Sequence, residues 1–232
     1  MSDITIITTC MNRSKFLELT LPTWVNQPIK EIIVLDWSSK ESIKPIIDKY
    51  QNGKIILARV EGKEFFSKSK AQNLVHRLTQ LNKADYILAI DCDIMLGTGF
   101  IEAHPMNDTI FYSGAGNIGD SFPIRSTTGT NLISYANFLQ VGGYNESMEG
   151  WGFEDSDFIS RLKTILEHKY FDPNLIKHIN HSNYLRSENY KTKDIYDSYY
   201  LNECFSRDPI NIYEKQDVIL YYPNGDVKKI NI

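Results

Sequence analysis

The sequence has few cysteines and no long apolar run. Its 232 residues include only Cys10, Cys92 and Cys204, which lie far apart and lack the paired spacing of a metal site. An odd number of widely separated cysteines argues against a disulfide framework and favours a reducing compartment. No apolar stretch approaches the ~18 residues that a bilayer-spanning helix needs, and the first residues lack the basic and apolar pattern of a secretion signal. We therefore expect a cytoplasmic protein without a transmembrane segment.

Clustered positive charge is missing as well. The chain has 25 Lys and Arg against 29 Asp and Glu, a formal net charge of −4. Nucleic acids and anionic membranes are bound through clustered basic side chains, so neither is expected as the main partner. A content of 42% hydrophobic and 23% charged residues is that of a folded globular protein. Nothing like a linker divides the chain, which predicts a single domain over residues 1–232.

Short aliphatic runs alternate with amphipathic stretches along the first hundred residues. The runs predict strands at 4–9, 31–35, 54–58 and 85–90, and the stretches between them predict helices at 14–25, 41–50 and 69–81. Continuous apolar strands that alternate with helices form a parallel sheet covered on both faces. We therefore predict an α/β, Rossmann-like fold with a mostly parallel central sheet. We also expect a strand near 175–179 and a C-terminal β-hairpin over 218–230 that turns at Asn224-Gly225.

Polar residues follow the predicted strands where each strand ends, at 9–13, 36–39 and 91–93. Ligands of such folds bind at the carboxyl ends of the parallel strands. Asp91 and Asp93 stand two residues apart, so in extended chain both carboxylates point to the same side. Paired carboxylates beside a phosphate suit Mg²⁺ or Mn²⁺. The first loop has no glycine, which argues against a nucleotidyltransferase and leaves a nucleotide held through a metal as the expected ligand.

The segment 150–158 combines three acids with a tryptophan between two glycines. It precedes a helical pattern, so its acids fall in a first helical turn, where the helix dipole favours each by roughly 0.3–1 kcal/mol. Asp157 and Arg161 also form an i,i+4 pair. Neither effect explains Trp151 between Gly150 and Gly152. Because glycine allows close approach of a ligand and an indole face can pack on a sugar ring, the segment is a candidate binding site.

Taken in order, these motifs resemble those of family-2-type glycosyltransferases with the GT-A fold. The resemblance rests on Thr9-x-x-Asn12-Arg13, on Asp36-x-Ser38 after a buried strand, on Lys70-Ala71-Gln72-Asn73 and on Asp91-x-Asp93. The later Gly-Trp-Gly-x-Glu-Asp run at 150–155 is similar to the motif of the β-1,4-galactosyltransferase and chondroitin-synthase-like group. Together the motifs span residues 4 to about 186, which is most of the chain.

The resemblance implies a metal-dependent transferase that moves a sugar from a nucleotide-sugar donor, in the first place a UDP-sugar, to an acceptor hydroxyl. It implies a nucleotide-binding half at 1–100, an acceptor-binding half at 101–190 and a C-terminal extension at 191–232. The acceptor would be a glycan, a glycolipid or a glycoprotein. The residues that the resemblance assigns to the donor are Thr9, Arg13, Asp36, Lys70, Asn73 and Asp91. Those that it assigns to the acceptor are Trp151, Gly152 and Glu154.

The metal and the catalytic base come from the same resemblance. Asp93 would bind Mn²⁺ or Mg²⁺, with His181 as a further ligand and His178 as an alternative or additional one. Residues three apart on an extended strand face opposite sides, so both histidines can bind only if the chain bends between them. Asp155, with Glu154 beside it, would be the catalytic residue that takes the acceptor's proton.

Three interpretations of the site stay open at this stage. The first is a transferase that inverts the anomeric carbon, with Asp155 as the general base. The second is a retaining transferase on the same fold. The third is a catalytically silent domain that binds a carbohydrate or a nucleotide, and the presence of both Asp91-x-Asp93 and Asp155 argues against it.

Overall fold

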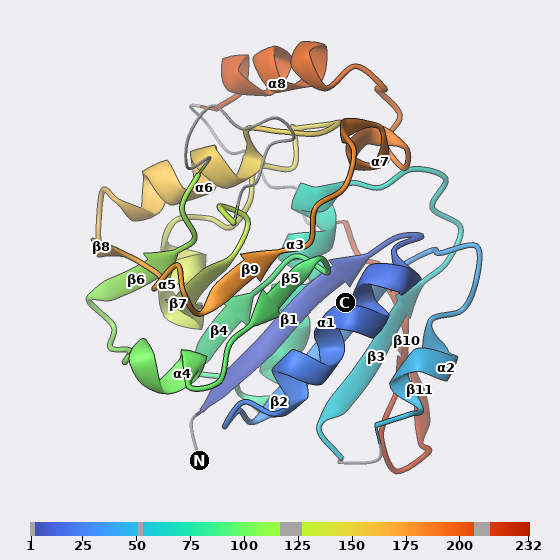
Figure 1. Ribbon diagram of the computed structural model, residues 1–232. Helices are drawn as coiled ribbons and strands as arrows, with labels where there is room; N and C mark the ends of the chain where they lie inside the picture. Colours follow the sequence, from blue (N-terminus) through green and yellow to red (C-terminus); the bar gives the residue numbers. More distant parts are fainter. Residues whose placement is uncertain (1–2, 51–52, 117–126, 207–213) are drawn as a thin grey trace.

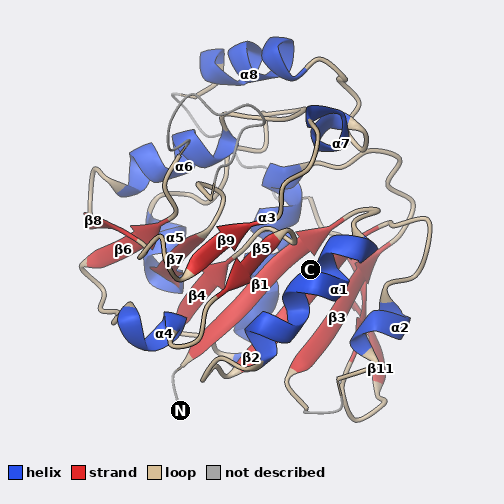
Figure 2. Cartoon of the chain, viewed as in Figure 1, coloured by secondary structure: helices blue, strands red, loops and turns tan. Residues whose placement is uncertain are grey.

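A nine-stranded sheet forms the centre of the computed structural model, which describes residues 3–50, 53–116, 127–206 and 214–232 (Figures 1 and 2). Its strand order is β11-β10-β3-β2-β1-β4-β7-β6-β8. The strands of this sheet are β1 (Ile4–Cys10), β2 (Glu31–Trp37), β3 (Ile55–Val60), β4 (Tyr86–Ala89), β6 (Ile110–Ser113), β7 (Asn131–Ser134), β8 (Glu167–Tyr170), β10 (Asp217–Tyr221) and β11 (Val227–Asn231). A second sheet pairs β5 (Ile94–Leu96) with β9 (Ile176–His178) in antiparallel fashion.

The four predicted N-terminal strands pair in parallel in the large sheet, as do β6 and β8. Strand β1 pairs in parallel with both β2 and β4, and β2 pairs in parallel with β3. The pairing then changes, since β7 runs antiparallel to β4 and to β6. The predicted hairpin is also present, and β10 pairs antiparallel with β3 at the register Tyr221↔Leu57. The hairpin is therefore part of the central sheet, not an appendage to it.

The helices cover both faces of the sheet, as predicted. Their bounds are α1 (Ser14–Val25), α2 (Lys44–Ile47), α3 (Lys68–Leu78) with the 3₁₀ turn η1 (Thr79–Asn82), α4 (Phe100–Ala103), α5 (Tyr135–Gln140), α6 (Glu154–Leu162), α7 (Asn183–Ser187) and α8 (Ile195–Cys204). The helix expected over 41–50 is only the short α2. Pro45 fits only in a first helical turn, and accordingly α2 begins at Lys44. In the described part of the chain, no helix has both the length and the apolar character to cross a membrane.

Alternating strand residues build two cores, one on each face of the sheet. Ile6 packs with Leu17 and Trp24 of α1 on one face. Ile7, its neighbour in β1, packs with Leu74 of α3 on the other face. Because the strand is buried on both sides, all seven of its residues are buried, which explains its continuous apolar character. The carboxyl end of the sheet thus emerges between α1 and α3, below α6, α7 and α8 in the view of Figure 1.

Candidate active site

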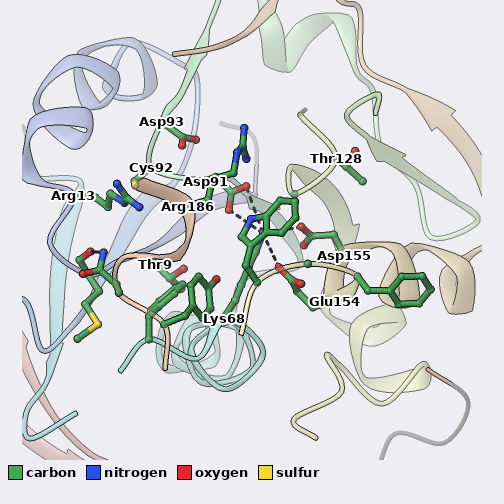
Figure 3. Close-up of a pocket in the computed structure, with 18 of the residues that line it drawn as sticks. Thr9, Arg13, Lys68, Asp91, Cys92, Asp93, Thr128, Glu154, Asp155 and Arg186 are labelled. Carbon is green, nitrogen blue, oxygen red and sulfur yellow. Dashed lines mark hydrogen bonds and ion pairs between the residues drawn. The ribbon is translucent and has the colours of Figure 1, made fainter. Parts of the chain in front are cut away.

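A cavity of about 230 Å³ opens at the carboxyl ends of β1 and β4. Its wall is formed by the loops after these two strands, the start of α3, residues 128–129 before β7, the 151–156 segment and residues of the last third of the chain (Figure 3). The cavity collects most of the residues singled out in the sequence. Those that line it are Thr9, Arg13, Asp91, Asp93, Trp151, Gly152, Glu154, Asp155 and His181.

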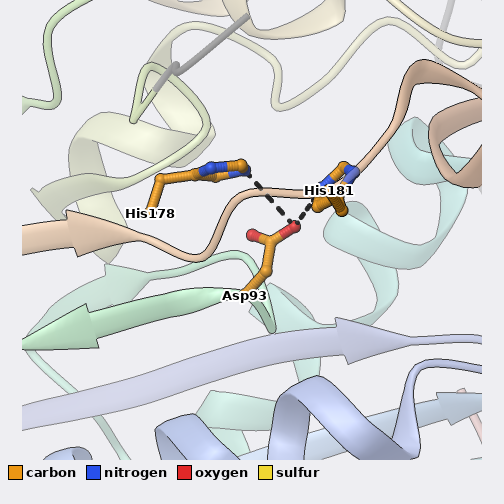
Figure 4. Close-up of side chains that lie close together, drawn as sticks. All are labelled: Asp93, His178 and His181. Carbon is orange, nitrogen blue, oxygen red and sulfur yellow. Dashed lines mark hydrogen bonds and ion pairs between the residues drawn. The ribbon is translucent and has the colours of Figure 1, made fainter. Parts of the chain in front are cut away.

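Asp93 faces two histidines at the edge of the cavity (Figure 4). Its Oδ2 lies 2.9 Å from Nε2 of His181 and 3.6 Å from Nε2 of His178. One nitrogen or oxygen of each residue lies within 4.8 Å of the others. The chain does bend between the histidines: β9 ends at His178, and the N–H of Ile179 donates to the carbonyl of Asp93 at 2.8 Å.

The three side chains fit a divalent metal. Burial alone would raise the pKa of Asp93, but hydrogen bonds from His178 and His181 hold it below its usual value. The carboxylate is therefore charged near neutral pH. A carboxylate with two imidazoles is a donor set that suits Mn²⁺ and other transition metals better than Mg²⁺, which prefers oxygen ligands.

Lys68 is the buried cation at the centre of the cavity, and no sequence motif pointed to it. Its Nζ lies 2.7 Å from Oδ2 of Asp155, 3.2 Å from Oδ1 of Asp91 and 3.7 Å from Oε1 of Glu154. Burial lowers the pKa of Lys68, but the attraction of the three carboxylates outweighs burial and sets this pKa well above its ordinary value. The lysine is therefore charged and partly compensates three neighbouring acids.

Asp155 and Glu154 differ in their environments, although they are adjacent in α6. One oxygen of Asp155, Oδ2, is held by Lys68, while Oδ1 has no hydrogen-bond partner among the described residues. Glu154 is 4% exposed, and burial, together with repulsion from Asp155, raises its pKa to about 7. Oε2 of Glu154 likewise has no hydrogen-bond partner among the described residues, but the side chain of Asp155 is 18% exposed and that of Glu154 only 5%. Asp157 lies outside the cavity wall and pairs with Arg161 at 2.6 Å, as the i,i+4 spacing predicted.

The structure does not bring three of the expected donor residues into the cavity. The amide of Asn73 is fully buried and donates to the carbonyl of Tyr144 at 2.8 Å, while its oxygen accepts from the N–H of the same residue at 2.7 Å. Asp36 is 1% exposed, accepts from the N–H of Ser39 and forms an ion pair with Arg59. Lys70 is also absent from the cavity wall. These three side chains therefore lie outside the wall of this cavity, and their role in binding the nucleotide stays a prediction.

The geometry of α3 explains why Lys68 lines the cavity and Asn73 does not. Helix α3 begins at Lys68, so this side chain projects from the end of the helix that meets the cavity. Asn73 follows five residues later, about 140° further round the helix, and faces the core. No sequence signal distinguished Lys68 from Lys70, because both lie in the first turn of α3.

Comparisons with known proteins found similar sequences and similar folds. Residues 111–183 match the family described as the N-terminal domain of galactosyltransferase. This range includes Trp151, Asp155 and both histidines. Over 95 residues, the chain is 39% identical to the hyaluronan synthase of Pasteurella multocida and 33% identical to the chondroitin synthase of strain Pm70 of that organism. The matched part is 39% of this chain, and the chain spans about a tenth of either relative, since the match covers 9% of each.

Solved structures share the fold. The catalytic domain of Drosophila β-1,4-galactosyltransferase 7, in complex with xylobiose, has a TM-score of 0.60 at 15% identity over 98% of this chain and 92% of that one. A mutant of that enzyme with manganese, UDP-Gal and xylobiose has a TM-score of 0.59 at 14% identity, over 88% of this chain and 79% of that one. The mannosyltransferase of Pyrobaculum calidifontis, with GDP-Man and Mn²⁺, has a TM-score of 0.57 at 15% identity, over 74% of this chain and 55% of that one.

The fold is therefore that of the GT-A glycosyltransferases. The chain's relatives in sequence are named for glycan synthases, and the matched domain is that of a galactosyltransferase. Several of its structural neighbours are complexes with Mn²⁺ and a nucleotide sugar.

Proposed function

We propose that this chain transfers a sugar from a UDP-sugar to the hydroxyl group of a glycan, glycolipid or glycoprotein acceptor, with inversion at the anomeric carbon. The observation that carries the proposal is the carboxylate of Asp155. It lies in the wall of the cavity with one oxygen held by Lys68 and the other without a partner among the described residues. A single displacement needs such a proton acceptor and no covalent nucleophile.

The donor would lie on the side of the cavity formed by Asp93 and the histidines. Asp93, His181 and His178 would hold Mn²⁺, which supplies positive charge to the leaving diphosphate. Arg13 lines the same cavity and forms an ion pair with Glu188 at 3.1 Å. The structural neighbours with UDP-Gal or GDP-Man and Mn²⁺ support this assignment of the donor.

The acceptor would enter over the 151–156 segment. Before the reaction, the ammonium group of Lys68 would stabilise the negative charge of the Asp155 carboxylate. Oδ1 of Asp155, which has no partner among the described residues, would then accept the proton of the attacking hydroxyl. The indole of Trp151, in the same wall, offers an apolar face to a sugar ring. The neighbours with bound xylobiose and the relatives named for hyaluronan and chondroitin support a glycan as the acceptor.

Three further assignments belong to this proposal. On the evidence of the Gly-Trp-Gly-x-Glu-Asp run, the chain would belong with the β-1,4-galactosyltransferase and chondroitin-synthase-like group. Residues 1–100 would bind the nucleotide and 101–190 the acceptor, within one domain whose last part is 191–232. A cytoplasmic location stays a prediction from the sequence.

Nucleotide release from a panel of UDP- and GDP-sugars, with Mn²⁺ and with a chelator, tests the proposal. We expect release from at least one UDP-sugar that depends on Mn²⁺. Asp155→Asn should keep UDP affinity and lose transfer by about 10²–10⁴-fold, the usual contribution of a positioned general base. Asp197→Asn, at an exposed acid of α8, is the matched control and should transfer normally.

The anomeric configuration of the product, read by NMR, tests the stereochemistry. We expect the anomeric configuration of the sugar to be inverted. A retained configuration would show that the chain is a retaining transferase. A protein that binds and releases no nucleotide sugar would contradict the enzymatic assignment and favour a silent binding domain.

A further inference from the structure

Helix α8 lies directly against the glycine-tryptophan-glycine loop. The hydroxyl of Ser198 donates to the carbonyl of Trp151 at 2.7 Å and accepts from the N–H of the same residue at 3.2 Å. The amide of Asn202 donates to the carbonyl of Gly152 at 2.7 Å and accepts from the N–H of Glu149 at 3.1 Å. Ser198 and Asn202 stand four residues apart, so both face the loop from one side of the helix. Each of these side chains is 2% exposed.

The same contact explains the two glycines. A Cβ atom on Gly150 would lie 2.6 Å from Cβ of Ser198, and one on Gly152 would lie 2.9 Å from Cδ2 of Tyr199. Both glycines also have positive φ, at +78° and +103°, which other residues adopt at a cost. The loop therefore has glycines at these positions because α8 packs on its backbone. This helix lies in the part of the chain, 191–232, that the sequence motifs did not assign.

Tyr199 brings an aromatic ring from α8 into the cavity wall, together with Trp151, Phe153 and Asp155. Its ring meets that of Phe153 edge to face, with centroids 5.3 Å apart. Its neighbour in the helix, Tyr200, is 64% exposed and does not line the cavity. Of these two adjacent tyrosines, only Tyr199 is directed to the site.

We propose that Tyr199 is an acceptor-binding residue and that Ser198 and Asn202 are positioning residues for the loop that holds Trp151. This inference rests on the proposed function, because the bound group is the sugar ring of the acceptor. The C–H face of a sugar packs on aromatic rings, and Trp151 and Tyr199 supply two such rings in the wall that also contains Asp155. The metal-binding side chains of Asp93 and His181 come from other elements, so the donor and the acceptor would have separate walls.

Binding of 4-nitrophenyl glycosides tests the role of Tyr199. A panel of xyloside, glucoside, galactoside, N-acetylglucosaminide and glucuronide is titrated into the full chain with UDP and Mn²⁺ present. We expect Tyr199→Ala to weaken the glycoside that binds the wild type by at least tenfold, which is the loss of about 1.4 kcal/mol. Tyr199→Phe should retain most of the affinity because the ring remains. Tyr200→Ala, the matched control, should bind as the wild type does.

UDP affinity, measured in the same samples, separates this inference from the proposed function. Unchanged UDP affinity in Tyr199→Ala, together with weakened glycoside binding, is the expected result. Wild-type glycoside affinity in Tyr199→Ala, or a wild-type chain that binds UDP but none of the glycosides, would overturn the inference alone. A wild-type chain that does not bind UDP in the presence of Mn²⁺ would overturn the proposed function as well.

Asn202→Ala tests the positioning role. The variant should weaken glycoside binding, because the loop loses the two hydrogen bonds that Asn202 makes with it. UDP affinity should stay unchanged, because Asn202 makes no hydrogen bond to Asp93, His178 or His181. A lower melting temperature with unchanged glycoside affinity would mean that Asn202 only stabilises the fold, and would overturn this part of the inference.

Discussion

The ammonium nitrogen of Lys68 lies 2.7 Å from Oδ2 of Asp155, although 87 positions separate the two residues in the sequence. Lys68 also contacts Asp91 and Glu154, so one cation faces three carboxylates in a buried site. Burial makes each unpaired charge costly, and the lysine therefore determines whether the acids can stay ionised together. It joins the start of α3, the loop after β4 and the start of α6 into one site.

Lys68→Met should destabilise the protein and abolish transfer. Removal of one partner from a buried ion pair leaves uncompensated charge and costs about 3–5 kcal/mol. Urea denaturation at pH 8 measures this loss. Lys70→Met, two residues along the same helix and outside the cavity wall, is the matched control and should lie close to the wild type. If the two variants lose the same stability and activity, the special role of Lys68 is refuted.

Glu154→Gln should stabilise the protein at alkaline pH. Burial raises the pKa of Glu154 from 4.5 to about 7, so between these values the folded state binds more protons than the unfolded state. Stability is therefore lost as the pH rises through this window, by up to about 3 kcal/mol at pH 8. The amide of the Glu154→Gln variant is uncharged at every pH, so its burial does not cause this loss of stability. The gain of the variant over the wild type should disappear below about pH 4.5.

Melting temperatures of wild type and Glu154→Gln from pH 4 to 8 check this prediction. The two curves should diverge as the pH rises. The matched control is Glu149→Gln, at an exposed acid just before the loop, which should follow the wild type throughout. Parallel curves for Glu154→Gln and the wild type would show that Glu154 has an ordinary pKa.

The sequence predicted the parts of this molecule that depend on neighbouring residues. The strands β1 to β4 and the helix α1 follow from short-range hydrophobic patterns, and Asp91 and Asp93 follow from the rule that sites lie at strand ends. The antiparallel addition of β10 to β3 did not follow, because a hairpin pattern does not indicate which strand edge it joins. Lys68 was missed for a similar reason, since its three partners lie 23 to 87 positions away.

Asn73 shows that a motif leaves the orientation of a side chain open. The resemblance implies a place beside the nucleotide, and in the structure the side chain bonds both backbone groups of Tyr144 inside the protein. The sequence predicted the helix that contributes to the cavity, but not which of its side chains would reach the cavity. That depends on where the helix begins, and α3 begins at Lys68. The loop glycines were interpreted as allowing close approach of a ligand, whereas the structure shows that α8 packs on the backbone there, a contact that only the three-dimensional structure reveals.

The two histidines should contribute unequally to metal binding. Nε2 of His181 is 2.9 Å from Asp93, whereas that of His178 is 3.6 Å away, so we expect His181→Ala to weaken Mn²⁺ binding by at least tenfold and His178→Ala by less. Calorimetric titration of Mn²⁺ in the presence of UDP measures both. His168→Ala is the control, because that ring bonds Ser113 away from the site. Wild-type Mn²⁺ affinity in His181→Ala would place the ligand elsewhere.

Gly129→Ala should impair donor binding more than folding. A Cβ atom at this position would lie 2.2 Å from Oδ2 of Asp91 and 2.8 Å from Nζ of Lys68. Both are the ends of side chains that can move, so the fold can accommodate the methyl group at a cost of about 1–3 kcal/mol. The displaced carboxylate would then lose its contact with Lys68. We expect UDP binding in the presence of Mn²⁺ to weaken by at least tenfold.

Gly116→Ala is the matched control for this clash, because among the described residues a Cβ atom there would meet its nearest neighbour, Oγ1 of Thr128, only at 3.7 Å. It should bind UDP as the wild type does. Calorimetry gives the UDP affinity of both variants, and thermal unfolding shows how much of each change is a loss of folded protein. A Gly129→Ala variant that is folded and binds UDP normally would mean that the position of the Asp91 carboxylate beside Lys68 does not matter for the donor, which would remove Asp91 from the binding site.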